Sequence, residues 1–201
     1  MINYEQERKN ELKKQTLKTY FGYDTFRPGQ EEIIAHILAG DDVLAVMPTG
    51  AGKSLCYQLP ALLMPGITVV VSPLISLMMD QVKALNEAGV HAAYINSSLT
   101  ENQIGKALEL AKSGQYKIIY VAPERLETPR FLDFACHTEL SMITVDEAHC
   151  ISQWGQDFRP SYVRILSFIQ QLPVRPVVSA FTATATERVR EDILGSLNLE
   201  R

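Results

Sequence analysis

The segment at residues 48–54 has the residue types and spacing of a phosphate-binding loop. It reads PTGAGKS and lies between an apolar, strand-like run and a helix-like stretch. Glycines allow backbone N–H groups to wrap a phosphate, and the start of a helix adds a favourable dipole. Lys53 can reach the β- or γ-phosphate of a nucleotide, and the Ser54 hydroxyl can ligate Mg²⁺. The segment therefore predicts a site for Mg²⁺ and ATP, held by Thr49, Gly50, Ala51, Gly52, Lys53 and Ser54.

The loop departs from the general pattern at its first position. The pattern G-x-x-x-x-G-K-[ST] begins with a glycine, and this chain has Met47 there. Gly50 and Gly52 remain, so the cradle for a phosphate is retained. The alternative is a glycine-rich turn with a chance lysine, and the strand–loop–helix context disfavours it.

Two adjacent carboxylates, Asp146 and Glu147, follow another strand-like run at residues 142–145. A carboxylate at the end of a strand can hold Mg²⁺, and the next one can orient and deprotonate an attacking water. The alternative is an exposed acidic pair at the start of a helix, which the phosphate loop upstream disfavours. We therefore expect Lys53, Asp146 and Glu147 to be the catalytic residues. Ser54 and Asp146 are the expected Mg²⁺ ligands.

Aromatic side chains gather with Arg27 and Gln30 at residues 20–30, shortly before the phosphate loop. A glutamine amide can pair with the edge of adenine, and an aromatic ring or an arginine can cover its face. The alternative is a hydrophobic helix end that packs on a sheet. The residues alone leave these two interpretations open.

Apolar runs alternate with helix-like stretches along the chain. The predicted strands are at residues 42–47, 68–72, 92–95, 117–122, 142–146 and 176–180, and the predicted helices at 53–64, 74–88, 101–113, 129–137, 162–171 and 186–197. Most strands are near-continuous Val, Ile and Leu, which is typical of strands buried on both faces. The alternation predicts an α/β fold, with a mostly parallel, doubly wound sheet and helices on both faces. Ligands in such folds bind at the carboxyl ends of strands, where the candidate residues stand.

The bulk composition is that of one globular domain with a net charge of −4. Proteins that bind nucleic acid usually have a basic surface. Either this chain binds none, or its basic groups are focused in one cleft, or other parts supply the grip. No apolar run is long enough to span a bilayer, so no membrane association is expected. The cysteines are too few and scattered for a disulfide framework, which favours a cytoplasmic protein.

The order of the motifs resembles the first RecA-like lobe of the RecQ DNA helicases, members of helicase superfamily 2. The matching segments read FRPGQ, PTGAGKS, SPLISLM, APERL, DEAHCISQWGQDFRPSY and TATAT, within residues 17–199. DEAH alone is shared with RNA helicases, whereas the extension that follows it is specific to RecQ proteins. Ala51 stands where the family often has glycine. The resemblance implies a RecA-like P-loop fold and a single ATP-binding helicase domain over residues 1–201.

The resemblance also implies roles for individual residues. The set that recognises adenine matches Tyr23, Arg27 and Gln30. The aromatic-rich loop of the family, here residues 152–162, has as its working side chains Trp154, Phe158 and Arg159. The motif that couples hydrolysis to movement of the lobes matches Thr182 and Thr184.

His149 stands beside the acidic pair and is interpreted as a polar relay from the ATP site to other parts of the protein. Its neighbour Cys150 is the one other His or Cys at ligand spacing, and that pair alone cannot complete a tetrahedral metal site.

The aromatic loop has a physical rationale of its own. Bases of single-stranded DNA stack on tryptophan and phenylalanine with little sequence preference, worth about 1–3 kcal/mol per base. The alternative is that Trp154 and Phe158 are core residues, but their polar neighbours favour an exposed or mobile loop. The basic residues near the amino terminus are instead expected on a solvated helix face: Arg8, Lys9, Lys13, Lys14 and Lys18.

The function implied by the resemblance is that of the amino-terminal motor lobe of an ATP-dependent DNA helicase. Hydrolysis of Mg-ATP would be coupled to binding of single-stranded DNA and to 3′-to-5′ unwinding of partly duplex DNA, in DNA repair and recombination. In a bacterium the protein would be cytoplasmic and associated with the nucleoid. The expected partner within the same protein is a second RecA-like lobe, which supplies an arginine finger and does not fit in this chain. The isolated lobe is therefore expected to lack unwinding.

Two other functions stay open on the residues. One is an RNA helicase lobe, which shares the DEAH motif, although the tract after His149 argues against it. The other is a module that binds a nucleotide or DNA without turnover.

Overall fold

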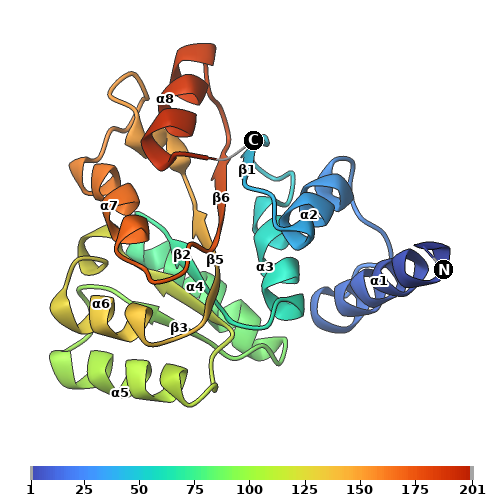
Figure 1. The fold of residues 1–201 in the computed structure, drawn as a ribbon, viewed down its shortest axis with the longest axis horizontal. Helices are drawn as coiled ribbons and strands as arrows, with labels where there is room; N and C mark the ends of the chain where they lie inside the picture. The colour runs from blue at the N-terminus through green and yellow to red at the C-terminus, as the bar shows by residue number, and fades with distance from the viewer. Residues whose placement is uncertain (1, 200–201) are drawn as a thin grey trace.

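The computed structural model describes residues 2–199, which form a sheet with helices around it (Figure 1). The strands are β1 (Val43–Val46), β2 (Ile67–Val71), β3 (Ala92–Ile95), β4 (Ile118–Val121), β5 (Leu140–Val145) and β6 (Val177–Thr182). The helices are α1 (Ile2–Thr16), α2 (Gln30–Ala39), α3 (Lys53–Leu63), α4 (Ile75–Glu87), α5 (Glu101–Lys112), α6 (Pro129–Cys136), α7 (Ile165–Gln170) and α8 (Glu187–Leu197). A π-helical turn spans Leu17–Phe21, and 3₁₀ turns span Pro123–Arg125, Ala148–Ile151 and Pro160–Arg164. The predicted alternation of strands and helices is confirmed.

The six strands are all parallel, in the order β1-β6-β5-β2-β4-β3. The last two strands along the chain, β5 and β6, therefore lie between β1 and β2. Val46 pairs with Thr182, and Val71 pairs with Val145, so these strands end level with one another. As a result, the segments that follow β1, β5 and β6 emerge side by side at the carboxyl edge of the sheet.

Strand β2 illustrates why the strands are so apolar. Every residue from Ile67 to Val71 is buried. Val69 and Val71 pack on one face of the sheet and Val70 on the other, because successive side chains of a strand point in opposite directions. Both faces are covered, so both sets of side chains must be apolar.

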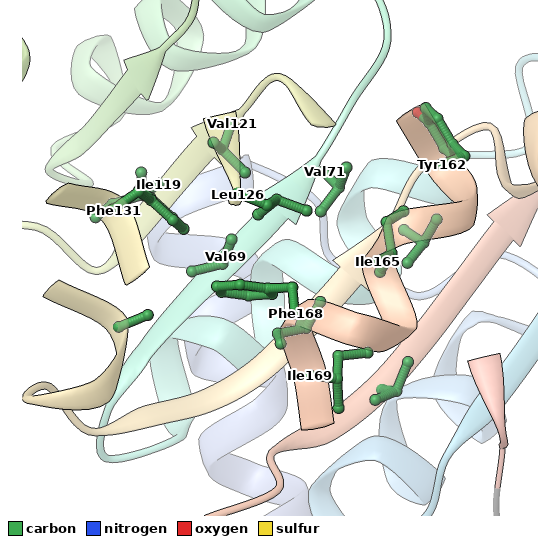
Figure 2. Packing of buried hydrophobic residues seen from close by; sticks show 14 of the residues in the cluster. Val69, Val71, Ile119, Val121, Leu126, Phe131, Tyr162, Ile165, Phe168 and Ile169 are labelled. Atoms are coloured by element: carbon green, nitrogen blue, oxygen red, sulfur yellow. The ribbon is translucent and has the colours of Figure 1, made fainter. Parts of the chain in front are cut away.

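Two hydrophobic cores fill the space between the sheet and its helices. Helices α5, α6, α7 and α8 pack on one face, and α2, α3 and α4 pack on the other. Figure 2 shows part of the first core, where Phe168 of α7 and Phe131 of α6 have ring centroids 5.8 Å apart. A third, smaller cluster joins α2 and α3 to the chain that follows α1, and it consists of Leu17, Ile34, Leu55 and Leu59.

Two features of the secondary structure differ from expectation. The helix predicted at residues 162–171 is divided, because Pro160 begins a separate 3₁₀ turn in which the Tyr162 N–H donates to the Arg159 carbonyl (2.9 Å). Helix α2 was not among the predicted helices. Its start at Gln30 is preceded by Gly29 at φ 81°, which has no side chain to form a capping hydrogen bond, so the start signal in the sequence is weak.

Helix α1 and the turn after it carry most of the basic residues near the amino terminus. Arg8, Lys9, Lys14 and Lys18 are exposed, as expected of a solvated face. Lys13 is the exception, since it is buried against the protein with its ammonium 3.6 Å from the Glu31 carboxylate. Within residues 2–199, no helix combines the length and the apolar character needed to cross a membrane.

Replacing Phe168 with alanine should lower the free energy of unfolding by about 3–5 kcal/mol, because the fully buried ring would leave a cavity between α7 and the sheet. Urea unfolding followed by circular dichroism measures this change. Val174→Ala is the control, because Val174 is 75% exposed and its truncation removes little packing. A loss for Phe168→Ala no larger than that of the control would contradict this account of the core.

Candidate nucleotide site and the neighbouring loop groove

A cleft of about 480 Å³ opens beside the phosphate loop at the carboxyl edge of the sheet. Ten of the predicted site residues line it: Tyr23, Arg27, Gln30, Thr49, Gly50, Gly52, Lys53, Ser54, Asp146 and Glu147. Ala51 is outside the lining set, and its carbonyl accepts a hydrogen bond from the Gln30 amide (3.4 Å). The lining also includes Phe21 and Thr25, from the segment at residues 20–30, and three residues that the sequence did not point to: Leu55, Gln58 and Leu77.

The phosphate loop requires glycine at two positions. Gly50 and Gly52 have φ angles of 83° and 84°, in the left-handed region that glycine enters at little cost. Lys53 begins α3 directly after the loop, so the first N–H groups of this helix have no partners within it and face the loop end. Met47, in place of the usual first glycine, is buried with its sulfur 3.8 Å from that of Cys56. The predicted strand–loop–helix arrangement is therefore present, with the unusual residue taken into the core.

Gln30 ties the segment before α2 to the phosphate loop. Its Oε1 accepts from the Arg27 N–H (2.8 Å), and its Nε2 donates to the Gly52 carbonyl (3.1 Å). The Arg27 guanidinium donates to the Gly50 carbonyl. Tyr23 stands 51% exposed in the lining of the same cleft. The sequence suggested a base contact for Gln30 but gave no sign of these bonds to the loop, and the base contact stays a prediction.

Asp146 and Glu147 leave β5 into this cleft. Asp146 is 7% exposed, and burial, followed by the charge of Glu147, raises the pKa of its carboxyl to about 6. Its Oδ1 accepts from the Glu147 N–H (2.9 Å). Glu147 has φ 50°, a left-handed conformation that costs a residue with a side chain about 1–3 kcal/mol. This turn holds the Glu147 carboxylate 3.7 Å from the Lys53 ammonium.

The oxygen donors of the cleft fit a magnesium ion. Ser54 offers a hydroxyl and Asp146 a carboxylate, and hard divalent cations prefer such oxygen ligands. The raised pKa of Asp146 shows that its ionised form lacks compensating charge, which a divalent cation would supply. Both residues lie beside Lys53, where phosphate oxygens would complete the ligand set.

His149 lies between the acidic pair and strand β6. Its Nδ1 is 3.0 Å from the Thr182 hydroxyl and 3.3 Å from the Glu147 carboxylate. Thr182 is fully buried and donates onward to the Thr184 carbonyl (3.2 Å), whereas the Thr184 side chain is exposed. The structure thus brings the predicted relay residue, His149, together with the predicted coupling residues at the end of β6.

A second groove, of about 290 Å³, lies next to this relay. It is lined by His149, Trp154 and Thr184, together with residues at the start of α8. The Trp154 side chain is 60% exposed, so the prediction of an exposed aromatic there is confirmed. The guanidinium carbon of Arg188 lies 3.4 Å from the centre of the Trp154 ring.

The aromatic loop is fastened to α8 and to the relay by polar and steric contacts. The Ser152 hydroxyl donates to the Asp192 carboxylate and accepts from the Trp154 N–H (3.1 Å). Gly155 lies so close to the His149 carbonyl that any Cβ there would collide with it. Asp192, like Arg188, was not predicted, because charged residues on an exposed helix face look like ordinary surface.

Phe158 and Arg159 take other positions than Trp154. Phe158 is half-buried, and neither side chain lines the groove beside Thr184. Arg159 donates two bonds to the Asp157 carboxylate (3.1 and 2.9 Å) and one to the Pro73 carbonyl (3.3 Å). The second half of the loop is thereby attached to the segment that follows β2.

Asp157 adds a third potential ligand to the His149–Cys150 pair. However, Arg159 already neutralises the Asp157 carboxylate. Burial, followed by the Asp157 charge, raises the pKa of the Cys150 thiol to about 11, so the thiol keeps its proton at neutral pH. In this arrangement the Asp157 carboxylate is therefore paired with Arg159 and the Cys150 thiol is protonated.

Comparisons with known proteins agree with this geometry. A family model described as DEAD/DEAH box helicase matches residues 27–193. The chain is 49% identical over 186 residues to the ATP-dependent DNA helicase RecQ of Bacillus subtilis (92% of this chain, 32% of the relative). It is 46% identical over 195 residues to the ATP-dependent DNA helicase Q5 of Rattus norvegicus (92% and 20%). The chain thus spans about a third of the length of the bacterial relatives it matches.

Solved helicase structures share the fold. The helicase domain of Pyrococcus furiosus Hef matches with a TM-score of 0.67 at 23% identity (88% of this chain, 36% of that one). A hypothetical ATP-dependent RNA helicase from Sulfolobus tokodaii matches with a TM-score of 0.70 at 21% identity (95% and 56%). These likenesses confirm the predicted α/β, RecA-like fold.

The raised pKa of Asp146 predicts how stability depends on pH. The pKa is about 6 in the folded protein against an ordinary 3.8, so ionising this group costs the folded state about 3 kcal/mol. The cost is absent below pH 4 and complete above pH 6. In a chelator, Asp146→Asn should therefore gain stability relative to the natural protein as the pH rises from 4 to 7.

Chemical unfolding across this pH range measures the difference. Asp80→Asn is the matched control, because Asp80 is exposed on α4 and should give a curve parallel to that of the natural protein. A parallel curve for Asp146→Asn as well would show that the Asp146 carboxyl is not desolvated.

Proposed function

The chain belongs to the DEAD/DEAH box helicase family, and we propose that it is the first motor lobe of a RecQ-type DNA helicase that binds and hydrolyses Mg-ATP. The observation that carries the proposal is the meeting of Lys53, Ser54, Asp146 and Glu147 in one cleft. Identity of 49% to RecQ helicases over 92% of the chain supports the choice of DNA helicase within the family.

Each side chain of the cleft has a distinct task in hydrolysis. Lys53 and the N–H groups of the loop bind the phosphates. Ser54 and Asp146 would hold Mg²⁺, which neutralises charge on the phosphate oxygens. Glu147 orients a water for attack on the γ-phosphate and accepts its proton, while ADP leaves on the opposite side.

The Lys53–Glu147 pair suggests an order for these events. At 3.7 Å the Lys53 ammonium is the ion-pair partner of the Glu147 carboxylate. Phosphate oxygens carry more charge than one carboxylate and would take over Lys53 as a partner. Glu147 would then be free to accept a proton from water once the nucleotide is in place.

The segment before α2 supplies the part of the site that selects the base. Tyr23 is exposed beside the loop and offers a ring for stacking, and Arg27 can cover the other side. Gln30 is bonded to the loop through both ends of its amide, so contact with adenine would exchange one of these bonds for one to the base. Selection of the base and the shape of the loop would then depend on the same residue.

The aromatic loop is the proposed contact with DNA. Trp154 is exposed beside the groove, and single-stranded bases stack on such a ring for about 1–3 kcal/mol each. The route from this ring to the ATP cleft is short, since His149 lines the groove and contacts both Glu147 and Thr182. Movement of the loop would therefore shift His149 and change the surroundings of the Glu147 carboxylate.

The activity of the whole protein extends the proposal. Because the chain is similar to part of the RecQ helicases, we assign 3′-to-5′ unwinding of partly duplex DNA, in repair or recombination, to a protein that contains this lobe together with a second one. A second RecA-like lobe would face the cleft and supply an arginine to the transferred phosphate, worth on the order of 10³–10⁵ in rate.

Two variants of the cleft test the catalytic assignment. Lys53→Ala should weaken binding of a fluorescent ATP analogue and lower single-turnover hydrolysis by at least about 100-fold, with binding of single-stranded DNA retained. Glu147→Gln should bind the analogue like the natural protein and lose about 10²–10⁴-fold in hydrolysis. Lys83→Ala, an exposed lysine on α4, is the control for charge.

The two readouts separate the alternatives. Nucleotide binding that survives Lys53→Ala would rule out the loop as the phosphate site. Hydrolysis that is unchanged in Glu147→Gln would remove the general base from the proposal and favour a binding module without turnover.

Fluorescence of Trp154 tests the DNA contact, because the chain has 1 tryptophan. Single-stranded oligothymidylate should quench the emission. The Arg188 contact competes with a stacked base and is worth about 0.5–1 kcal/mol, so Arg188→Ala should tighten binding about 2- to 5-fold relative to Arg190→Ala. Arg190 is the matched control, because it carries the same charge on α8 and pairs with Glu187.

Absence of quenching at saturating DNA would contradict a stacking role for this ring. Tighter binding of an oligouridylate of the same length than of the DNA would favour the RNA helicase alternative.

A further inference from the structure

Helix α3 carries two buried polar side chains below the nucleotide cleft, Tyr57 and Gln58. They follow Ser54 by three and four residues, so all three lie on one side of the helix. Tyr57 is 1% exposed and Gln58 is 6% exposed. Gln58 nevertheless lines the cleft together with Ser54 and Asp146. The second turn of α3 therefore forms the floor beneath the proposed magnesium ligands.

Hydrogen bonds link this floor to a strand and to a second helix. Gln58 Nε2 donates to the Tyr120 hydroxyl of β4 (2.8 Å) and to Gln81 Oε1 of α4 (2.9 Å). The Tyr57 and Tyr120 hydroxyls lie 3.3 Å apart. Buried polar groups without partners are costly, and each of these four side chains has at least one partner in the set. We call Tyr57, Gln58, Gln81 and Tyr120 the floor network.

The floor network reaches both proposed magnesium ligands. Ser54 lies one turn before Tyr57 on the same side of α3, close enough for its side chain to influence the Tyr57 hydroxyl, and Gln58 lines the cleft together with Ser54 and Asp146. The Tyr57 ring also packs on Phe181, with centroids 5.4 Å apart, directly before the coupling motif. The two phenols thus sit where a change in hydroxyl direction would alter the surroundings of the magnesium ligands.

Packing alone does not account for these residues. Phenylalanine at both positions would fill the same core with no polar group to satisfy, and it would remove the Tyr57 hydroxyl that lies next to the Ser54 side chain. When a neighbouring group fixes the direction of a hydroxyl, its rotational freedom is already lost in the folded protein and is not lost again when the metal binds. Groups behind a metal ligand raise the affinity of the site for the metal in this way.

We propose that Tyr57, Tyr120 and Gln58 are positioning residues that aim the Ser54 hydroxyl and the Asp146 carboxylate at the magnesium ion of the bound nucleotide. The proposal rests on the function assigned above, because it presumes a Mg-nucleotide in the cleft. The floor network acts through Ser54 and Asp146 and touches neither the phosphates nor the attacking water.

The test is the concentration of Mg²⁺ that gives half-maximal binding of a fluorescent ATP analogue to this chain. Tyr57→Phe should raise this concentration about 10-fold, within the range found for groups that orient metal ligands. Tyr120→Phe acts one step further away and should raise it by a smaller factor. Binding of the analogue in a chelator should stay within about 2-fold of the natural protein, because phosphate contacts are untouched.

Tyr94→Phe is the matched control. Tyr94 lies on the neighbouring strand β3 directly opposite Tyr120 and packs against the same core. Loss of its hydroxyl should leave the Mg²⁺ requirement unchanged. If either buried tyrosine variant fails to fold, Gln81→Leu loosens the network from its half-buried end on α4 and should still raise the Mg²⁺ requirement.

The outcomes separate this proposal from the function on which it rests. If the natural chain binds the analogue without any dependence on Mg²⁺, the proposed function itself fails. If that dependence is present and the Tyr57, Tyr120 and Gln81 variants behave like Tyr94→Phe, only the positioning role is overturned. A fall in melting temperature with an unchanged Mg²⁺ requirement would likewise identify the network as purely structural.

Discussion

Two adjacent carboxylates emerge from a strand that is buried on both faces, and the cleft is arranged around the cost of their charge. Asp146 is nearly removed from water, and Glu147 adopts a left-handed backbone conformation beside it. The Lys53 ammonium and the N–H of Glu147 compensate for these charges only in part, since the pKa of Asp146 stays raised to about 6. A cluster that is short of positive charge gains from a cation, which gives a physical reason for binding a nucleotide together with magnesium. The phosphate loop completes the balance, because its N–H groups and lysine favour the anionic end of the same ligand.

The order of the strands is what makes this cluster possible. Strands β5 and β6 are the last two along the chain and lie between β1 and β2 in the sheet. The acidic pair and Thr182 therefore lie beside the phosphate loop, although that loop is far earlier in the sequence. Parallel pairing then fixes their height, because Val46 is level with Thr182 and Val71 with Val145. The two cores hold the strands in this register, since a slip by one residue would move the side chains packed in one core into the other, where they do not fit. The packing that stabilises the two cores therefore also fixes the positions of the residues in the cleft.

Local features of this protein could be predicted from sequence, and contacts between distant segments could not. Aliphatic runs identified the strands because both faces of the sheet are covered, and the loop was recognisable because Gly50 and Gly52 need positive φ angles. The bonds from the Gln30 amide to the loop depend on how two segments approach each other, which no local pattern records. The same holds for the Trp154–Arg188 contact and for the floor network, where a tyrosine of β4 meets the second turn of α3. Such residues look like ordinary surface or core until the fold places them together.

Glu147 is the point at which the two halves of the proposed mechanism meet. Its carboxylate has Lys53 on one side at 3.7 Å and His149 on the other at 3.3 Å. Once phosphates occupy Lys53, His149 is the remaining partner, and His149 is in turn held by the Thr182 hydroxyl and by the close fit of Gly155 under its carbonyl. A displacement of the aromatic loop would then change the surroundings of the general base directly, with no need for a long chain of intermediaries. In the proposed mechanism, this proximity would let stacking of a base on Trp154 govern hydrolysis, because one histidine lines the loop groove and contacts the Glu147 carboxylate.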